Sequence, residues 1–206
     1  MTNELPAGFI YVSDVVLDII EDIKYYSSDN FLGVRVEGYE SPRAVSTISA
    51  AKALQKATSQ LKKDGYSLKI FDAYRPKRAV DHFLRWVNDL EDTKTKAIFY
   101  PDIKKDQLIK NGYIGPNSRH SSGSAFDVTL VNRMTGQELD MGTVFDFFGQ
   151  KSHHGTHLIT SEQTQNRHIL KRAMVENGFQ AIKEEWWHYQ LEDEPYPLTA
   201  FNFIVK

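Results

Sequence analysis

The chain has 206 residues and a formal net charge of −2 at pH 7, from 25 Lys and Arg against 27 Asp and Glu. Because this balance is nearly neutral, it gives no general attraction to nucleic acid or to a membrane surface, and we expect neither as a partner. The sequence contains no cysteine, which excludes disulfides, thiolate metal sites and cysteine nucleophiles and leaves His, Asp and Glu as possible metal ligands.

The beginning of the chain carries no readable targeting signal. Met1 to Pro6 lack the basic start and apolar run of a signal peptide, and no stretch of about 18 apolar residues could span a bilayer. We therefore expect a cytoplasmic protein without a membrane segment. A hydrophobic fraction of 41% is sufficient for a core, and the length suits a single domain over residues 1–206.

In chain order, the first predicted elements are a short strand at 34–36 and a long helix. Ser41 and Pro42 fit an N-cap and a first helical turn, the residues that follow have apolar side chains at helical spacing, and Gly65 acts as a stop. Residues 67–73 then predict a strand, and residues 77–90 predict a second helix.

The second half of the chain alternates between irregular segments and clear elements. Residues 91–119 are polar and contain glycines and prolines, which predicts a mostly irregular segment. A strand is predicted at 124–131, a hairpin turn at 132–136, a loop at 142–160, a helix at 161–176 and a strand at 185–191. Since helices and strands come in mixed order, we expect an α+β fold with a central, mainly antiparallel sheet flanked by helices.

One candidate site lies in the stretch from Ser118 to Asp127. His120 stands in a loop of small residues, and Asp127 follows seven positions later within an apolar strand. A carboxylate among Ala, Phe, Val and Leu is costly to bury unless a cation or hydrogen-bond donors meet it, and a divalent metal would remove this cost. The alternative interpretation is that Asp127 caps a turn and that His120 lies on the surface.

A second candidate stretch, Glu185-Trp186-Trp187-His188, begins the last predicted strand. Residues three apart in a flat strand point to opposite faces. Glu185 and His188 can therefore reach one site only if Glu185 lies in a turn or bulge that enters the strand. The alternative is an aromatic core strand with an incidental ion pair.

Together the two stretches provide two imidazoles, one carboxylate and a further glutamate. A catalytic zinc site needs three protein ligands and an open position for water. His120, Asp127 and His188 could therefore hold one Zn²⁺, while Glu185 moves the proton of the water.

Another histidine pair is a possible alternative set of metal ligands, and an arginine is a further candidate for the site. His153 and His157 are four residues apart, but a zinc helix of the H-E-x-x-H kind would have Glu at the position of His154. Arg75 follows a predicted strand, where its guanidinium could face negative charge that develops on a substrate oxygen. The alternative for Arg75 is a structural ion pair with Asp72.

At these residues the sequence resembles the D-alanyl-D-alanine dipeptidases of the VanX type. These zinc peptidases are related to D,D-carboxypeptidases and share a fold with hedgehog signalling domains. The pattern S-x-H-x-x-G-x-A-x-D is met from Ser118 to Asp127, and E-x-W-H is met from Glu185 to His188. Segments 72–76 and 140–146 also resemble their counterparts, so the resemblance extends over most of the chain.

The resemblance implies a hydrolase with one zinc ion per chain that cleaves the free D-alanyl-D-alanine dipeptide. It implies that His120, Asp127 and His188 bind the zinc ion. It also implies that Glu185 acts as the general base and then as the general acid.

The same resemblance suggests roles for four further side chains. Arg75 would stabilise the oxyanion of the tetrahedral intermediate, and Asp146 would pair with the ammonium group of the substrate. Ser118 and Tyr25 would contact the rest of this small substrate.

Three other functions stay open at this point. A D,D-carboxypeptidase or cell-wall endopeptidase would use the same zinc site on peptidoglycan peptides, although the missing export signal argues against it. A non-haem iron oxygenase also uses two His and a carboxylate, but its usual H-x-D spacing is absent. A non-enzymatic zinc-binding module would have no use for Glu185 and Arg75. A role in glycopeptide resistance and a role in scavenging D-alanine fit the sequence equally well.

Overall fold

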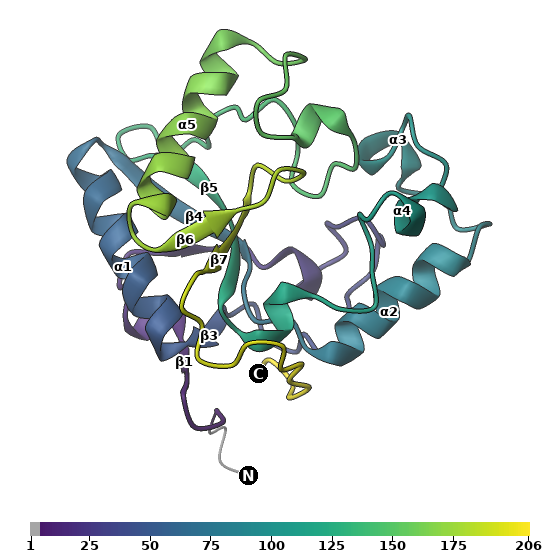
Figure 1. Cartoon of the computed structure of the whole chain (residues 1–206), viewed down its shortest axis with the longest axis horizontal. Helices are drawn as coiled ribbons and strands as arrows, with labels where there is room; N and C mark the ends of the chain where they lie inside the picture. Colours follow the sequence, from purple (N-terminus) through teal and green to yellow (C-terminus); the bar gives the residue numbers. More distant parts are fainter. Residues whose placement is uncertain (1–4) are drawn as a thin grey trace.

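A five-stranded sheet forms the centre of the computed structural model, which describes residues 5–206 (Figure 1). β2 and β4 are parallel, whereas the other three neighbouring pairs are antiparallel. The predicted α+β fold with a mainly antiparallel sheet is therefore confirmed. The prediction that Met1 to Pro6 form no signal peptide falls partly on residues 1–4, which lie outside the described residues. In their order across the sheet, the strands are β2 (Ile20–Glu21), β4 (Tyr66–Asp72), β5 (Ala125–Asn132), β7 (His188–Leu191) and β6 (Phe179–Ala181).

The helices form two groups beside this sheet (Figure 1). α1 (Ile48–Lys63) contacts β4, and α5 (Ser161–Val175) contacts β6 and packs against α1. α2 (Lys77–Asn88), α3 (Lys96–Phe99) and α4 (Gln107–Lys110) gather on the other side of the view. All residues of β5 except its last are buried, so this strand runs through the core and gives its polar side chains a water-poor environment.

The first predicted helix begins later than its expected cap. The prediction that Ser41 and Pro42 start the helix is wrong, because β3 (Val45–Thr47) intervenes and pairs antiparallel with β1 (Phe9–Tyr11). The β-branched residues of β3 favour an extended backbone, so the chain completes a strand before it turns into α1.

The true cap and the end of α1 follow ordinary helix chemistry. Thr47 is the N-cap, and its hydroxyl accepts from Ala50 N at 3.3 Å. The helix ends at Lys63, and Gly65 follows with a positive φ of 85°, so the predicted stop is confirmed.

Four other predicted elements, β4, α2, β5 and α5, begin and end within two residues of their expected bounds. The turn after β5 is also confirmed, because Asn132 N donates to Gln137 O at 2.8 Å. The predicted strand at 34–36 is wrong, since Val36 N donates to the carbonyl of Tyr25 instead of to a partner strand.

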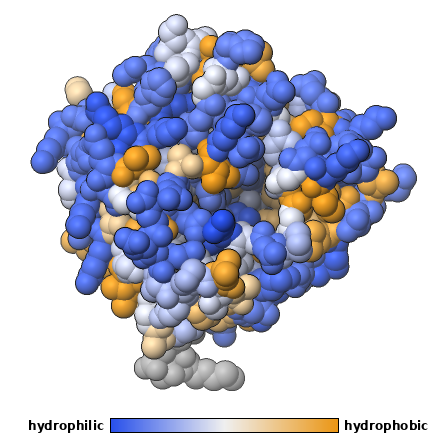
Figure 2. Space-filling model, in the orientation of Figure 1, coloured by the Kyte–Doolittle hydropathy of each residue, from blue (hydrophilic) through white to orange (hydrophobic). Residues whose placement is uncertain are grey.

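The molecule presents a mixed surface. The face drawn in Figure 2 is mostly hydrophilic, carries scattered hydrophobic side chains and is hollowed near its centre. Among the described residues, none of the helices has the length and apolar character that a bilayer crossing requires.

Candidate active site

Three neighbouring strands bring polar side chains together. Asp127 of β5 stands opposite His188 of β7, and Asp72 of β4 stands opposite Asp127. The register of β4 shifts between Ile70 and Asp72, so Phe71 is an extra residue at this point. Such a bulge changes the direction of the side chains that follow it. The three polar residues therefore occupy adjacent positions across the sheet.

His120 reaches the same place through a tight turn. It lies in the 3₁₀ helix η3 (Arg119–Ser122), and Ser118 caps this helix by accepting from His120 N at 3.3 Å. Gly123 ends the turn in the left-handed conformation, with a φ of 82°, and its N–H donates to His120 O. The small residues after His120 thus let the chain fold back toward Asp127, as the sequence predicted.

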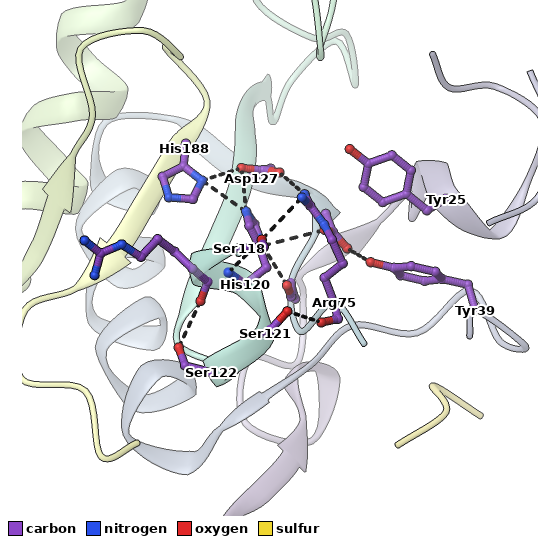
Figure 3. A network of polar contacts seen from close by, with 12 residues as sticks. Tyr25, Tyr39, Arg75, Ser118, His120, Ser121, Ser122, Asp127 and His188 are labelled. Atoms are coloured by element: carbon purple, nitrogen blue, oxygen red, sulfur yellow. Dashed lines mark hydrogen bonds and ion pairs between the residues drawn. The ribbon is translucent and has the colours of Figure 1, made fainter. Parts of the chain in front are cut away.

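The side chains of His120, Asp127 and His188 converge on one point (Figure 3). His120 Nε2 lies 3.0 Å from His188 Nδ1 and 3.2 Å from Asp127 Oδ1, and His188 Nδ1 lies 3.1 Å from the same oxygen. All three residues are buried. In the part of the chain that the structure describes, no second group of three such ligands is found, and His153 and His157 do not join this one.

The hydrogen bonds of His120 leave its inward nitrogen free to bind a cation. His120 Nδ1 lies 2.7 Å from Ala73 O, and because a carbonyl oxygen can only accept, Nδ1 carries the proton of the neutral ring. The lone pair of Nε2 then faces Asp127 and His188. A hydrogen bond from the outer nitrogen to a carbonyl is the usual support of a metal-binding histidine.

Spacing and charge both fit a divalent ion at this point. Ligand atoms about 2.0–2.2 Å from a tetrahedral zinc ion are about 3.3–3.6 Å apart, close to the 3.0–3.2 Å found here. The carboxylates of Asp72 and Asp127 contact the guanidinium of Arg75, and Asp146 and Glu185 line the same cavity, so acidic groups outnumber this one basic group. A dication would offset this surplus of negative charge.

Glu185 lies in the turn that leads into β7. The sequence required such a position, because only from a turn or bulge can Glu185 reach the same site as His188. The predicted strand at 185–191 thus begins at His188, whose N–H donates back to Glu185 O at 3.4 Å. Glu185 Oε2 lies 3.9 Å from His188 Nδ1, and 22% of the Glu185 side chain is exposed. Burial raises the pKa of Glu185 to about 7 against the opposing charge of His188, so this carboxyl group can accept and donate a proton near neutral pH.

The contacts of Arg75 fit both interpretations that the sequence left open. Its Nε donates to Asp72 Oδ2 at 2.9 Å, which is the expected structural ion pair. Its other nitrogens face the site, where Nη2 lies 3.5 Å from Asp127 Oδ2 and Nη1 lies 3.4 Å from Ser118 Oγ. Burial acts to lower the pKa of Arg75, but Tyr25 and the carboxylates raise it well above its usual value, so the guanidinium is charged.

Tyr25 and Asp146 form a second polar pair near Arg75. Tyr25, in η2 (Lys24–Tyr26), donates its hydroxyl to Asp146 Oδ2 at 2.7 Å, and both residues are buried. Asp146 has a φ of 59°, a left-handed conformation that is uncommon outside glycine and is often found at functional sites. Burial and the charge of Asp127 raise the pKa of Asp146 well above its usual value.

A cavity of about 250 Å³ connects these groups. Its polar lining consists of Tyr25, Arg75, Ser118, His120, Asp127, Asp146, Glu185 and His188, beside an apolar wall that includes Phe31, Val80, Phe83, Ile114, Phe148 and Ile182. The structure thus brings all the site residues predicted from the sequence around one space. This space is smaller than the roughly 300–1,000 Å³ of drug-sized ligand sites, which suits a small substrate.

Sequence reasoning missed part of the cavity wall and Tyr39, which binds Asp72 behind Arg75. Tyr113 and Ile114 line the cavity although they belong to segment 91–119, for which the sequence predicts no role beyond its irregular backbone. Tyr39 donates its hydroxyl to Asp72 Oδ1 at 2.7 Å. The place of Tyr113 and Ile114 in the cavity wall and the hydrogen bond of Tyr39 both depend on packing between segments that are distant in the chain. No local sequence pattern indicates such packing.

The chain is similar over nearly its whole length to known dipeptidases. Residues 6–206 match a family model, Peptidase_M15, described as D-ala-D-ala dipeptidase. The chain is 44% identical over 199 residues to the D-alanyl-D-alanine dipeptidase of Enterococcus faecalis, which covers 97% of this chain and 98% of that protein. The protein of the same name from Streptomyces coelicolor is 40% identical over 201 residues, with coverage of 98% and 100%. Among solved structures, a Zn(II) complex of a variant of the vancomycin resistance D,D-pentapeptidase VanY covers 72% of this chain and 73% of that one, with 15% identity and a TM-score of 0.42.

Proposed function

Because this chain belongs to the family of D-alanyl-D-alanine dipeptidases, we propose that it hydrolyses D-alanyl-D-alanine to two molecules of D-alanine with the help of one zinc ion. The observation that carries this proposal is the convergence of His120, Asp127 and His188 beside Glu185 in one small cavity. The family model spans residues 6–206, which supports the further proposal that the chain is one dipeptidase domain.

His120, Asp127 and His188 would hold the zinc ion through their three converging atoms. When bound, the ion supplies a Lewis acid for the peptide carbonyl and lowers the pKa of water toward about 7. Burial acts to raise the pKa of Asp127, but the imidazoles of His120 and His188 lower it below its usual value. Asp127 is therefore ionised, as a metal ligand must be.

Glu185 would move the proton. Its carboxylate takes a proton from the attacking water, whose oxygen forms the new bond to the carbonyl carbon of the substrate. When the bond between that carbon and the amide nitrogen breaks, the same carboxyl group gives the proton to the departing nitrogen. A group with a pKa of about 7 can perform both steps.

Arg75 would stabilise the negative charge that develops on the carbonyl oxygen. Its Nε is bound to Asp72, and this contact leaves the two terminal nitrogens directed toward the cavity. A preoriented cation at this point stabilises an oxyanion more than the neutral carbonyl, which lowers the barrier of the reaction.

The carboxyl group of Asp146 would bind the ammonium group of the dipeptide, with Tyr25 and Ser118 as further contacts. A cation beside Asp146 would also offset the cost of burying its charge. The small cavity disfavours a longer peptide, because burying further unpaired polar groups costs more than additional contacts gain. We further propose the cytoplasm as the place of action.

The test compares the free dipeptide with its N-acetylated form, which has no ammonium group. Purified protein supplied with zinc should release D-alanine from D-alanyl-D-alanine with a kcat/KM at least about 10²-fold above that for N-acetyl-D-alanyl-D-alanine, since the buried partner of the ammonium is otherwise unpaired. Asp146→Asn should reduce this preference. Equal rates on the two peptides would indicate a D,D-carboxypeptidase and contradict the proposal.

A further inference from the structure

Asp72 is fully buried behind Arg75, and both of its oxygens accept a hydrogen bond. Oδ2 accepts from Arg75 Nε at 2.9 Å, and Oδ1 accepts from the hydroxyl of Tyr39 at 2.7 Å. Asp72 does not line the cavity, and neither does Tyr39. The two residues therefore form a support behind Arg75 that a substrate in the cavity would not touch.

Tyr39 is itself held by the C-terminal segment, residues 201–205. Tyr39 forms a β-bridge with Val205, whose N–H donates to Gly38 O at 2.9 Å and whose carbonyl accepts from Glu40 N at 2.8 Å. Tyr39 is 1% exposed, and the centroid of its ring lies 5.6 Å from the centroid of the Tyr25 ring. These contacts hold Tyr39 with its hydroxyl bound to Asp72 Oδ1.

The same segment also ties down the backbone on both sides of the site. Phe201 N donates to Ser121 O at 3.0 Å in η3, and Phe201 O accepts from Lys77 N at 2.9 Å, two residues after Arg75. Ser121 Oγ in turn donates to Arg75 O at 2.9 Å. The end of the chain, to which the sequence assigns no role, is thus connected to the segments that carry His120 and Arg75.

We propose that Tyr39, held by the C-terminal segment, is a positioning residue that fixes Asp72 and thereby the guanidinium of Arg75. An arginine side chain has several rotatable bonds. Its terminal nitrogens are therefore held in one place more firmly when the carboxylate that accepts from Nε is itself fixed by a second hydrogen bond. Without the Tyr39 hydroxyl, Asp72 Oδ1 loses its partner and the carboxylate can turn, which moves Arg75. A displacement near 1 Å at a reacting group can cost about 10²-fold in rate.

The inference rests on the proposed function through the role of Arg75, and its test therefore includes a readout that does not depend on activity. Tyr39→Phe removes one buried hydroxyl. The matched control is Thr58→Val, which removes a buried hydroxyl in α1, away from the cavity and the C-terminal segment, that donates to the backbone carbonyl of Leu54 at 2.9 Å. Tyr39→Phe should lose more thermal stability than Thr58→Val, because it leaves a buried carboxylate oxygen without a donor.

The kinetic readout separates positioning from folding. Tyr39→Phe should lower kcat by between about tenfold and 10²-fold with little change in KM, whereas Thr58→Val should retain the kcat of the unmodified protein. In an Arg75→Ala background, the additional Tyr39→Phe substitution should change kcat less than about twofold, because its route to the substrate is already removed. An equal loss of kcat in both backgrounds, or no loss in either, would overturn the proposal.

The spectroscopic readout follows the Arg75 Nε–H resonance by NMR, which is assigned by its disappearance in Arg75→Ala. In Tyr39→Phe this resonance should shift and exchange faster with water, whereas Thr58→Val should leave it in place. An unmoved resonance in Tyr39→Phe would overturn the positioning role. If the unmodified protein released no D-alanine, the proposed function would fall, and this comparison would still decide whether Tyr39 positions Arg75.

Discussion

Glu185 stands apart from the other acidic residues of the site, because it reaches the cavity from a turn and keeps 22% of its side chain exposed. Asp72, Asp127 and Asp146 are buried and bound to fixed partners. A general base must meet a water molecule in each turnover, and partial exposure permits this. The position of Glu185 in the turn thus matches the proton transfer that we propose for it.

Replacement of Glu185 by glutamine tests this assignment at the scale of one side chain. Glu185→Gln keeps the shape but cannot accept a proton, so kcat should fall by about 10²–10⁴-fold. Zinc content, measured by mass spectrometry, should stay at the level of the unmodified protein, because Glu185 is not among the three converging ligands. A variant that keeps its kcat would remove Glu185 as the base.

The pH dependence of the reaction offers a second view of the same carboxyl group. Burial raises the pKa of Glu185 to about 7, and a bound dication lowers it again by charge attraction. As the base must be deprotonated, kcat/KM should rise with pH through a value below 7 and then level off. Glu185→Gln should lack this rise.

At the scale of elements, the turn at η3 depends on Gly123. Its backbone is left-handed, and a Cβ at this position would lie 2.3 Å from Cε1 of Phe9. The ring of Phe9 cannot move away, because it packs against four aromatic rings, those of Tyr74, Tyr196, Phe201 and Phe203. The fold of η3, and with it the place of His120, is therefore tied to the aromatic core.

Gly123→Ala should accordingly lower the free energy of unfolding by about 2–4 kcal/mol, from left-handed strain and overpacking together. Gly136→Ala is the matched control, since Gly136 also has a positive φ but nothing lies within 4 Å of its added Cβ. The control should lose only about 1–2 kcal/mol. Urea denaturation of both variants measures the difference, and equal losses would show that the Phe9 contact is unimportant.

The same elements show what could be predicted from the sequence. The small residues between His120 and Asp127 predicted a chain that folds back, and the three-residue spacing of Glu185 and His188 required the turn that the structure contains. Periodicity located the long helices and strands, because their apolar faces repeat locally. The start of α1 was predicted too early at Ser41, since pairing of β3 with a distant strand overrides the local cap signal.

At the scale of the whole molecule, the site depends on contacts that cross the full length of the chain. Tyr25 donates a hydrogen bond to Asp146, Tyr39 forms a β-bridge with Val205, and β4 pairs with β5. No spacing rule connects such partners, so their assignment from the sequence required the family resemblance or was missed altogether. The consequence is that the proposed metal ligands come together only in the folded chain, so ion binding and folding should be linked.

The central claim is that His120, Asp127 and His188 hold one zinc ion at which the dipeptide is cleaved. It is tested most directly by titrating chelator-treated protein with zinc while D-alanine release from D-alanyl-D-alanine and the melting temperature are both measured. Release and melting temperature should rise together and level off at one zinc per chain, with a stabilisation of about 2.7 kcal/mol at a free zinc concentration 100 times Kd. His120→Ala should show neither rise. Full release of D-alanine from the zinc-free protein, or an unaltered response in His120→Ala, would contradict the account.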